Sequence, residues 1–372
     1  MGNLETVILS KYIFKEIFKV QAVTLSVLVV MLVSQSVIKY VGRAASGQIP
    51  SSIISQMVIY SLPSVLYIML PLSLFVGVLV ALGRISTDSE MVVMRSVGFS
   101  TASILKIVMW LALGTAVASA TVSLYVEPWA VRSQDKLVDD AKKNPQYMPV
   151  EAGRFVNFSY KYTVFLNDVS TSRSGNKDTS NIYLFSQPFN TAEGFVITST
   201  SGHVQYDEDG NQWVHLIDGN RYEGPLASGE FRRMHFEKAE FPSDINSGKR
   251  DEQNTISGLT TAQLMESDDP KAKIEIQWRI SPIFVCFIMT MVAVPLGLIN
   301  PRQGRFARLG PAILLYISYY MLILGFRNMM NSGIMWMYPG LYSVPLIFLL
   351  FVALPLYTGS GILNTLRNIR KK

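Results

Sequence analysis

The sequence predicts an α-helical integral membrane protein with six transmembrane helices in a three-plus-three arrangement, and an extramembrane all-β domain inserted between spans three and four. Two observations carry this prediction. Six long stretches contain no Asp, Glu, Lys or Arg, and a polar insert with charges of both signs separates the first three from the last three. A helix needs about 20 apolar residues to cross a bilayer core of about 30 Å, and a charge inside that core costs several kcal/mol.

The expected domain boundaries follow these stretches. Residues 1–126 form an N-terminal transmembrane half, residues 127–275 the extramembrane domain with its connectors, and residues 276–372 a C-terminal transmembrane half. The predicted spans are residues 20–38, 53–82, 104–126, 278–299, 309–326 and 337–357. The first span is about 19 residues long and lacks a small-residue cleavage site, so we expect it to be an uncleaved helix.

Composition excludes several other classes. The chain is 49% hydrophobic and 16% charged, against about 25% charged residues in a typical soluble domain. Its net charge of +6 does not indicate a nucleic-acid binder, because the basic residues gather at span ends. Cys286 is the only cysteine, which excludes a disulfide within the chain and a cysteine zinc cluster.

Basic residues also predict the orientation in the membrane. One side of the membrane receives both termini and most of the arginines and lysines next to the spans, whereas the opposite short loops offer only Lys39, Arg43 and Arg327. By the positive-inside rule, both termini are cytoplasmic and the inserted domain lies outside. The residues on the cytoplasmic side are Lys11, Lys15, Lys19, Arg84, Arg95, Arg302, Arg305, Arg308, Arg367, Arg370, Lys371 and Lys372.

The insert begins with an expected helix at residues 132–141 and then becomes a β domain. Short runs rich in Val, Ile, Phe, Tyr and Thr alternate with clusters of Gly, Asn, Asp and Ser, which is typical of antiparallel strands. A compact sandwich or jelly roll is the expected architecture. The predicted strands are residues 154–159, 162–168, 181–186, 195–200, 203–206, 213–218 and 231–241.

The sequence offers little catalytic chemistry. His203, His215 and His235 fall on predicted strands with a spacing that matches no metal motif, and they are interpreted as polar strand positions. No nucleophile elbow, metalloprotease helix or Walker A loop is present. We therefore expect a chain that is not an enzyme and that binds no metal or cofactor of its own.

A cytoplasmic segment at residues 87–98 is expected to form a short helix. Thr87 and Glu90 match a capping box, and Gly98 supplies a stop. Met91 and Met94 make the segment unusually apolar, so it either packs against the span ends or presents methionines to a partner. The residues alone leave these alternatives equally open.

A second cytoplasmic segment ends the fourth span. Asn300, Pro301, Arg302 and Arg305 could anchor to anionic lipid or position the same partner.

Three basic residues lie on the outer side. Lys39 and Arg43 are four residues apart on one helical face just past the first span, and Arg327 closes the fifth. Snorkelling to ordinary lipid phosphates explains such residues in most membrane proteins. The alternative is a cluster that binds a large anionic amphiphile.

Several local strings, besides the three-plus-three layout, are shared with a known family. They are Leu70-Pro71-Leu72-Ser73-Leu74-Phe75, Leu82-Gly83-Arg84, Ser89-Glu90-Met91-Val92-Val93-Met94-Arg95, Ser201-Gly202-His203, Asp218-Gly219-Asn220-Arg221-Tyr222-Glu223-Gly224, Val294-Pro295-Leu296 and Asn300-Pro301-Arg302-Gln303-Gly304-Arg305. In these strings, and along nearly its whole length, the chain resembles the LptF/LptG (YjgP/YjgQ) family of lipopolysaccharide export permeases, and its F branch more than its G branch.

The resemblance implies a permease subunit of an ABC transporter in the bacterial inner membrane. Its partners would be a cytoplasmic ATPase dimer (LptB-like) that holds ATP and Mg²⁺, a second six-span permease (LptG-like), a periplasmic jellyroll protein with one membrane helix (LptC-like) and a periplasmic bridge (LptA-like). Spans one and five would line a cavity that lipopolysaccharide enters from the outer leaflet. Glu90, Met91, Met94 and Arg95 would seat in the ATPase, and Lys39 would contact lipopolysaccharide phosphate, with Arg43 and Arg327 nearby.

Three alternatives stay open at this stage. One is a permease of the lipoprotein-release or macrolide-export type, although such chains carry the outer domain after the first of four spans. Another is a membrane-anchored enzyme that modifies envelope lipids, which would need a catalytic site in residues 127–275. The third is a structural anchor for a periplasmic complex.

Overall fold

The computed structural model describes residues 2–45, 49, 51–96, 100–143, 153–157, 162–171, 177–186, 195–206, 212–223, 232–242, 256–298 and 309–358. The chain divides into two units. The helical unit comprises residues 1–34, 61–130 and 256–372, and the sheet unit comprises residues 35–60 and 131–255.

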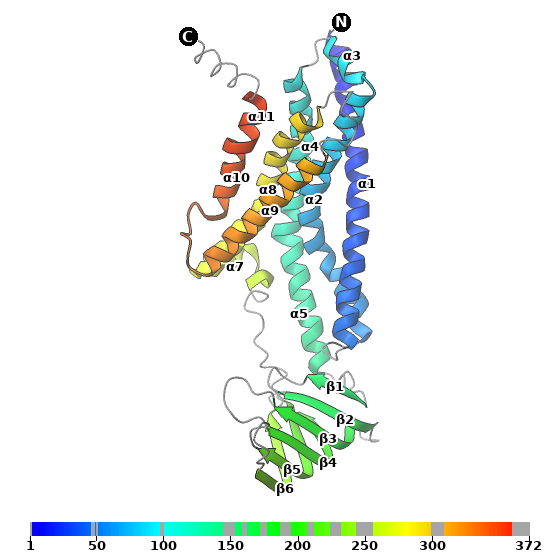
Figure 1. Cartoon of the computed structure of the whole chain (residues 1–372), viewed down its shortest axis with the longest axis vertical. Coiled ribbons are helices and arrows are strands. Elements are labelled where there is room, and N and C mark those ends of the chain that lie inside the picture. Colours follow the sequence, from blue (N-terminus) through cyan, green and yellow to red (C-terminus); the bar gives the residue numbers. More distant parts are fainter. Residues whose placement is uncertain are drawn as a thin grey trace. The chain divides into compact units, whose positions relative to one another are not determined.

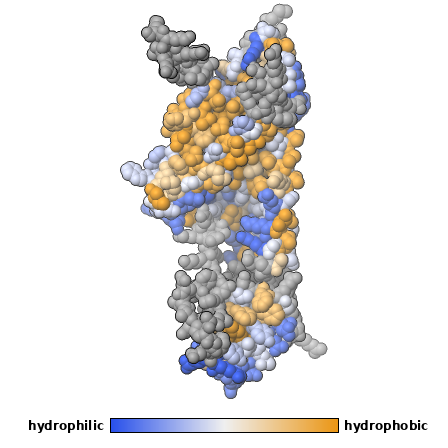
Figure 2. Space-filling view, viewed as in Figure 1, coloured by the Kyte–Doolittle hydropathy of each residue, from blue (hydrophilic) through white to orange (hydrophobic). Residues whose placement is uncertain are grey.

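Within the described residues, six helical segments are long and apolar enough to cross a membrane, which confirms the predicted fold class (Figure 1). The short helix α3 lies between the second and third spans, and the short helix α7 precedes the fourth. Figure 2 shows a predominantly hydrophobic surface over the helical unit. The helices are α1 (Gly2–Ala45), α2 (Ile54–Thr87) after a short 3₁₀ turn η1 (Ser51–Ile53), α3 (Glu90–Ser96), α4 (Thr101–Thr121) with the π-helical turn η2 (Val122–Val126) and α5 (Glu127–Lys143), α7 (Thr261–Glu266), α8 (Pro270–Gly297), α9 (Leu309–Asn331), and a last span built of η5 (Gly340–Tyr342), α10 (Ser343–Phe348), η6 (Leu349–Ala353) and α11 (Leu354–Thr358).

Two helices are much longer than the predicted spans. The 44 residues of α1 correspond to about 66 Å of helix, more than twice the thickness of a bilayer core. The helix begins 18 residues before the predicted span. Lys11, Lys15 and Lys19 limit the apolar stretch from which the span was predicted, but they do not end the helix, because they lie on its exposed face. At the other end of the bundle, α5 continues the third span and contains the helix expected at residues 132–141.

The core of the helical unit forms where α2, α4, α8 and α9 face one another. Phe75, Val108, Cys286 and Tyr319 are all fully buried in it, and Ile17 of α1 packs against the same cluster. Their helices have no polar face, so burial against neighbouring helices rather than amphipathicity fixes which side of each helix points inwards. This packing brings the ends of α8, α9 and η2 together.

The sheet unit holds one six-stranded antiparallel sheet whose spatial order follows the sequence (Figure 1). The inserted all-β domain is therefore confirmed, whereas its jelly-roll arrangement stays a prediction, because the described strands pair as a single meander. The strands are β1 (Arg154–Asn157), β2 (Tyr162–Thr171), β3 (Lys177–Ser186), β4 (Phe195–Tyr206), β5 (Gln212–Glu223) and β6 (Arg232–Pro242).

The prediction of two separate strands at residues 195–200 and 203–206 is wrong, since β4 runs through both. Gly202 is a packing position and not a turn. A Cβ atom there would lie 2.5 Å from Ile182 Cδ1 and 2.8 Å from the backbone oxygen of His215. Gly219 on β5 plays the same part beneath the ring of Phe236. Glycine in a strand commonly marks such a close approach.

A Gly202→Ala substitution is therefore expected to destabilise the sheet by about 1–3 kcal/mol, because the added methyl group must displace backbone. The loss of stability is measured by heating the full chain and following the protease resistance of the sheet unit. Gly114→Ala on α4 is the control, since nothing lies within 4 Å of its Cβ position. Equal protease resistance of the two variants would contradict the packing role of Gly202.

Candidate functional site

Two polar clusters interrupt the apolar helical unit. The Arg279 cluster comprises Tyr67, Glu275, Trp278, Arg279 and Arg327 together with the polar groups that Arg279 contacts. The Arg84 cluster comprises Tyr12, Glu16, Arg84, Asp88 and Glu90. Both are built by residues far apart in the sequence, so the fold has to bring them together.

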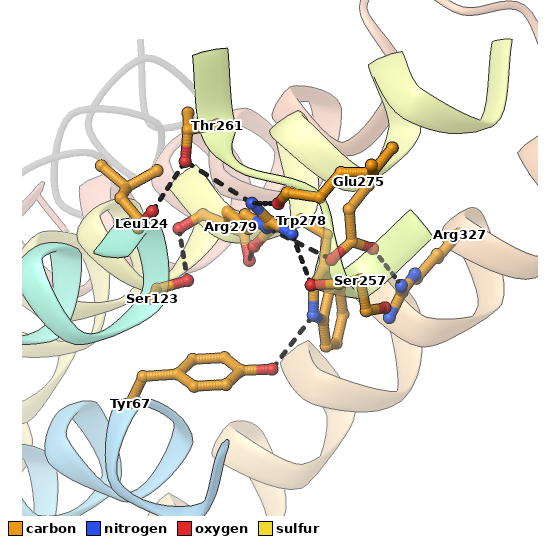
Figure 3. Close-up of polar contacts among 11 residues, drawn as sticks. Tyr67, Ser123, Leu124, Ser257, Thr261, Glu275, Trp278, Arg279 and Arg327 are labelled. Atoms are coloured by element: carbon orange, nitrogen blue, oxygen red, sulfur yellow. Dashed lines mark hydrogen bonds and ion pairs between the residues drawn. The ribbon is translucent and has the colours of Figure 1, made fainter. Parts of the chain in front are cut away.

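Arg279 is fully buried at the start of the apolar part of α8, and its guanidinium is almost fully paired (Figure 3). Its Nη2 donates to the backbone oxygen of Ser257 (2.8 Å), and its Nη1 to that of Leu259 (3.0 Å) and to Thr261 Oγ1 (3.5 Å). Its Nε faces Glu275 Oε1 at 3.4 Å, one helical turn earlier. Arg279 thus fixes residues 257–261, where the chain leaves the sheet unit, to α8.

The π-helical turn η2 joins the same cluster from the third span. Ser123 Oγ donates to the backbone oxygen of Arg279 at 3.0 Å, and Thr261 Oγ1 donates to that of Leu124 at 2.7 Å. Figure 3 shows these contacts converging on Arg279 from three separate segments. The chain segments that enter and leave the inserted domain therefore meet at Arg279, the first through its backbone oxygen and the second through its guanidinium.

Arg327, near the end of α9, is held by α8. Its Nη2 donates to Glu275 Oε2 at 2.7 Å, and its guanidinium lies 4.2 Å from the centre of the Trp278 ring. Trp278 Nε1 in turn donates to the Tyr67 hydroxyl of α2 at 3.1 Å. The Arg327 side chain is 14% exposed, so the predicted phosphate contact is an engaged and largely buried residue in this conformation.

Lys39 and Arg43 lie side by side in the part of α1 that belongs to the sheet unit. Both side chains make cation–π contacts with the Tyr40 ring, with Lys39 Nζ at 5.8 Å and Arg43 Cζ at 6.0 Å from the ring centre. Tyr40 itself is buried against Met57 and accepts a hydrogen bond from Gln134 of α5 at 3.3 Å. The structure therefore brings Lys39 and Arg43 together, as their spacing predicts, on an exposed stretch of helix.

The Arg84 cluster corrects the predicted capping box. Thr87 ends α2 and its Oγ1 donates to the backbone oxygen of Gly83 at 2.8 Å, so it caps nothing. Ser89, at φ 60°, makes the turn into α3, and Glu90 is the first residue of that helix. Glu90 Oε2 accepts from the Tyr12 hydroxyl of α1 at 2.8 Å instead of bonding its own backbone. A tertiary partner has replaced the local cap.

Arg84 of α2 joins this helix to α1 and to the turn that precedes α3. Its Nη1 lies 3.0 Å from Glu16 Oε1 of α1, its Nη2 3.5 Å from the Tyr12 hydroxyl, and its Nε 4.0 Å from Asp88 Oδ2. On α3, Met91 and Met94 are buried in the helical core, whereas Val92 and Val93 are 60% and 65% exposed and Arg95 is exposed. One face of α3 thus packs against the spans and the opposite face is accessible.

Comparison with known proteins identifies the family. The model of a family described as lipopolysaccharide export system permease LptF/LptG matches residues 11–358. The lipopolysaccharide export system permease protein LptF of Escherichia coli K12 is 31% identical over 348 residues, which are 92% of each chain, and LptF of Shigella flexneri matches equally well. The chain belongs to the LptF/LptG family. This match does not favour the lipoprotein-release alternative or the envelope-lipid enzyme.

The remaining predicted residues contribute less to the site of this LptF/LptG chain. Asn300, Pro301, Arg302 and Arg305 lie outside the described residues. On the sheet, His215 Nδ1 lies 3.2 Å from Glu240 Oε1, His235 Nε2 lies 3.9 Å from Asp218 Oδ1, and His203 pairs with His215 in the strand register. No group of metal-ligating side chains forms among the residues that the structure describes.

Glu275 and Arg279 were not predicted from the sequence as functional residues. Their signal was nevertheless present, because opposite charges four residues apart at the start of an apolar span are neighbours on one helix face. A charged residue within a span of an LptF/LptG permease needs a partner in the bundle. That partner set could not be read from spacing, because it includes the carbonyls of Ser257 and Leu259 from another segment.

Removing the Arg279 guanidinium by an Arg279→Met substitution is expected to destabilise the protein by about 3–5 kcal/mol, since it orphans the buried polar groups around it. Thermal unfolding of the purified protein in mild detergent measures the loss. Lys273→Met on the same helix is the control, because the Lys273 side chain is partly exposed and its ion pair with Asp268 spans 3.7 Å. Similar melting temperatures for both variants would refute a structural role for Arg279.

Proposed function

We propose that this chain is the permease subunit of an ABC transporter that extracts lipopolysaccharide from the outer leaflet of the inner membrane and passes it to a periplasmic β-jellyroll bridge. ATP hydrolysis on a partner subunit would drive the transport. The observation that carries the proposal is the family match over residues 11–358, on a chain with six candidate spans and an inserted sheet.

The orientation is part of the proposal. The distribution of Lys and Arg supports cytoplasmic termini and a periplasmic sheet. The Arg84 cluster and α3 would then face the cytoplasm, and the Arg279 cluster would lie at the periplasmic end of the spans. This assigns ATPase contact to the first cluster and substrate contact to the second.

The accessible face of α3 is the proposed docking surface for a cytoplasmic, LptB-like ATPase dimer. Val92, Val93 and Arg95 would contact the ATPase, while Met91 and Met94 hold α3 to the core. Glu90 connects α3 to α1 through Tyr12. Closure of the ATPase dimer would therefore displace α3 together with the helices to which it is tied.

Lipopolysaccharide is the proposed substrate, with its acyl chains on apolar span faces and its phosphates at basic side chains. Lys39 and Arg43 present two cations on one exposed helix stretch, which suits charge-assisted contacts with phosphate. A second, LptG-like permease would complete the cavity. An LptC-like and an LptA-like jellyroll would receive the lipid, with strand addition at an edge of the sheet as the mode of contact.

Native mass spectrometry of the protein extracted from its own membrane tests the whole proposal. The expected spectrum is a complex that contains an ATPase dimer, a second six-span chain and an adduct of lipopolysaccharide mass. An intact preparation that yields only a lone chain or a homodimer, without ATPase or glycolipid, would overturn the proposal.

A Glu90→Ala substitution is expected to uncouple ATP hydrolysis from export while the fold stays intact, because it removes the carboxylate that links α3 to Tyr12. Lipopolysaccharide release from proteoliposomes and ATPase activity, measured on the same preparation, report the coupling. Glu90→Gln still accepts the Tyr12 hydrogen bond and should restore part of the coupling. Asp268→Ala, an exposed acid that belongs to neither polar cluster, serves as the control. Unchanged export in Glu90→Ala would exclude the coupling role.

A further inference from the structure

We propose that the Glu275–Arg327 ion pair is a latch that holds α9 against α8 and opens when the anionic head group of the transported lipid takes over the Arg327 guanidinium. This inference rests on the proposed function and adds a regulation of its substrate site. Arg327 would be shared between a resident carboxylate and an incoming phosphate, and each exchange would change how firmly α9 is held.

Arg327 is the only charged residue in α9, and its pair with Glu275 is the salt bridge that this helix makes among the residues that the structure describes. The rest of α9 is held by apolar packing. Tyr316, Tyr319 and Ile323 are buried against the bundle, whereas Leu314 and Met321 on other sides of the helix are 65% and 61% exposed. Loss of the contact at Arg327 would therefore leave one end of α9 attached by apolar packing alone.

The interface between α8 and α9 beside the latch, called here the α8–α9 seam, is incompletely packed. A small, mostly apolar cavity lies between α2, α8 and α9, lined by Tyr67, Trp278, Tyr316 and Tyr320 among others. Two of these residues, Tyr67 and Trp278, belong to the Arg279 cluster itself. Because close-packed side chains resist displacement, this cavity leaves the neighbouring side chains of α9 room to move.

Arg327 has donors left for a second oxyanion. Its Nη2 binds Glu275, its face lies over Trp278, and its Nε has no hydrogen-bond partner among the described residues. A guanidinium binds phosphate through two parallel N–H donors, and both such pairs, Nε with Nη2 and Nη1 with Nη2, include the nitrogen that binds Glu275. Occupation by phosphate and pairing with Glu275 would thus compete.

Glu275 is not left unpaired when Arg327 departs. Its other oxygen, Oε1, stays 3.4 Å from Arg279 Nε, and Arg279 is fixed by the carbonyls of Ser257 and Leu259. A buried carboxylate that lost its only cation would carry a heavy desolvation penalty. Arg279 reduces this desolvation penalty, because it still pairs with Glu275 after Arg327 has left. An isolated buried pair would have no such second cation.

Two variants distinguish a latch that opens when lipid binds from an ion pair that only stabilises the fold. Glu275→Gln removes the competing charge while its side-chain oxygen can still accept from Arg279, and it should increase lipopolysaccharide retention about tenfold, a typical value for one charged hydrogen bond. Arg327→Gln removes the phosphate ligand and should lower retention about tenfold. Retention of purified lipopolysaccharide by the full complex in nanodiscs is measured by native mass spectrometry. Asp268→Asn, an exposed carboxylate beside α8, is the control and should leave retention unchanged.

A distance measurement supplies an independent readout. Spin labels at Lys273 on α8 and Met329 on α9, both partly exposed, report the separation of the two helices. The latch requires that this separation widens in the wild type when lipopolysaccharide is added, and that it is already wide without lipid in both Gln variants. This readout on the wild type also decides the question if a Gln variant fails to fold.

The outcomes are distinct. A decrease in retention for both Gln variants, unchanged retention in Glu275→Gln, or a constant α8–α9 separation on addition of lipid would each overturn the latch. If the wild type retains lipopolysaccharide in those cases, the proposed function stands and only the latch fails. A wild-type complex that retains no lipopolysaccharide would instead refute the proposed function itself.

Discussion

The contacts of the buried Arg279 guanidinium, at the start of α8, are the interaction on which the neighbouring part of the helical unit depends. Burial of a cation costs several kcal/mol unless its donors are paired, and here carbonyls of residues 257 and 259 and the Glu275 carboxylate supply the partners. Because those carbonyls belong to the segment that returns from the inserted domain, the cost can be recovered only when that segment is in place. Arg279 thereby makes correct docking of the returning chain a condition of folding.

The six spans and the β insert were predictable because their signals are local. Hydropathy over about 20 residues identifies a span, and alternation with turn residues identifies a strand. The sites were less predictable because they depend on distant partners. Thr87 and Glu90 satisfy a capping pattern, yet Tyr12, 78 residues from Glu90, takes the carboxylate. Gly202 is typical of a turn in sequence, and only the neighbouring strands show that it is a packing position.

The two readings of α3 that the residues alone left open are compatible in the structure. A seven-residue helix has too few backbone hydrogen bonds to be stable by itself, so Met91 and Met94 have to pack against the spans. That packing leaves Val92 and Val93 on the outside. Apolar residues on both sides of α3 therefore leave one face for the bundle and one accessible face, which is what the proposed ATPase contact requires.

The helix α2 joins the two polar clusters covalently. Arg84 near its end contacts Glu16, and Tyr67, 17 residues earlier, holds Trp278 beside Arg327, so about 26 Å of helix separates the clusters. Pro71 lies between them and removes one backbone hydrogen bond from the helix. A displacement of α3 would reach Arg84 first, and bending at Pro71 would then determine how much of it arrives at Tyr67. In the proposed cycle, α2 is accordingly the element that carries the motion of the ATPase to the α8–α9 seam.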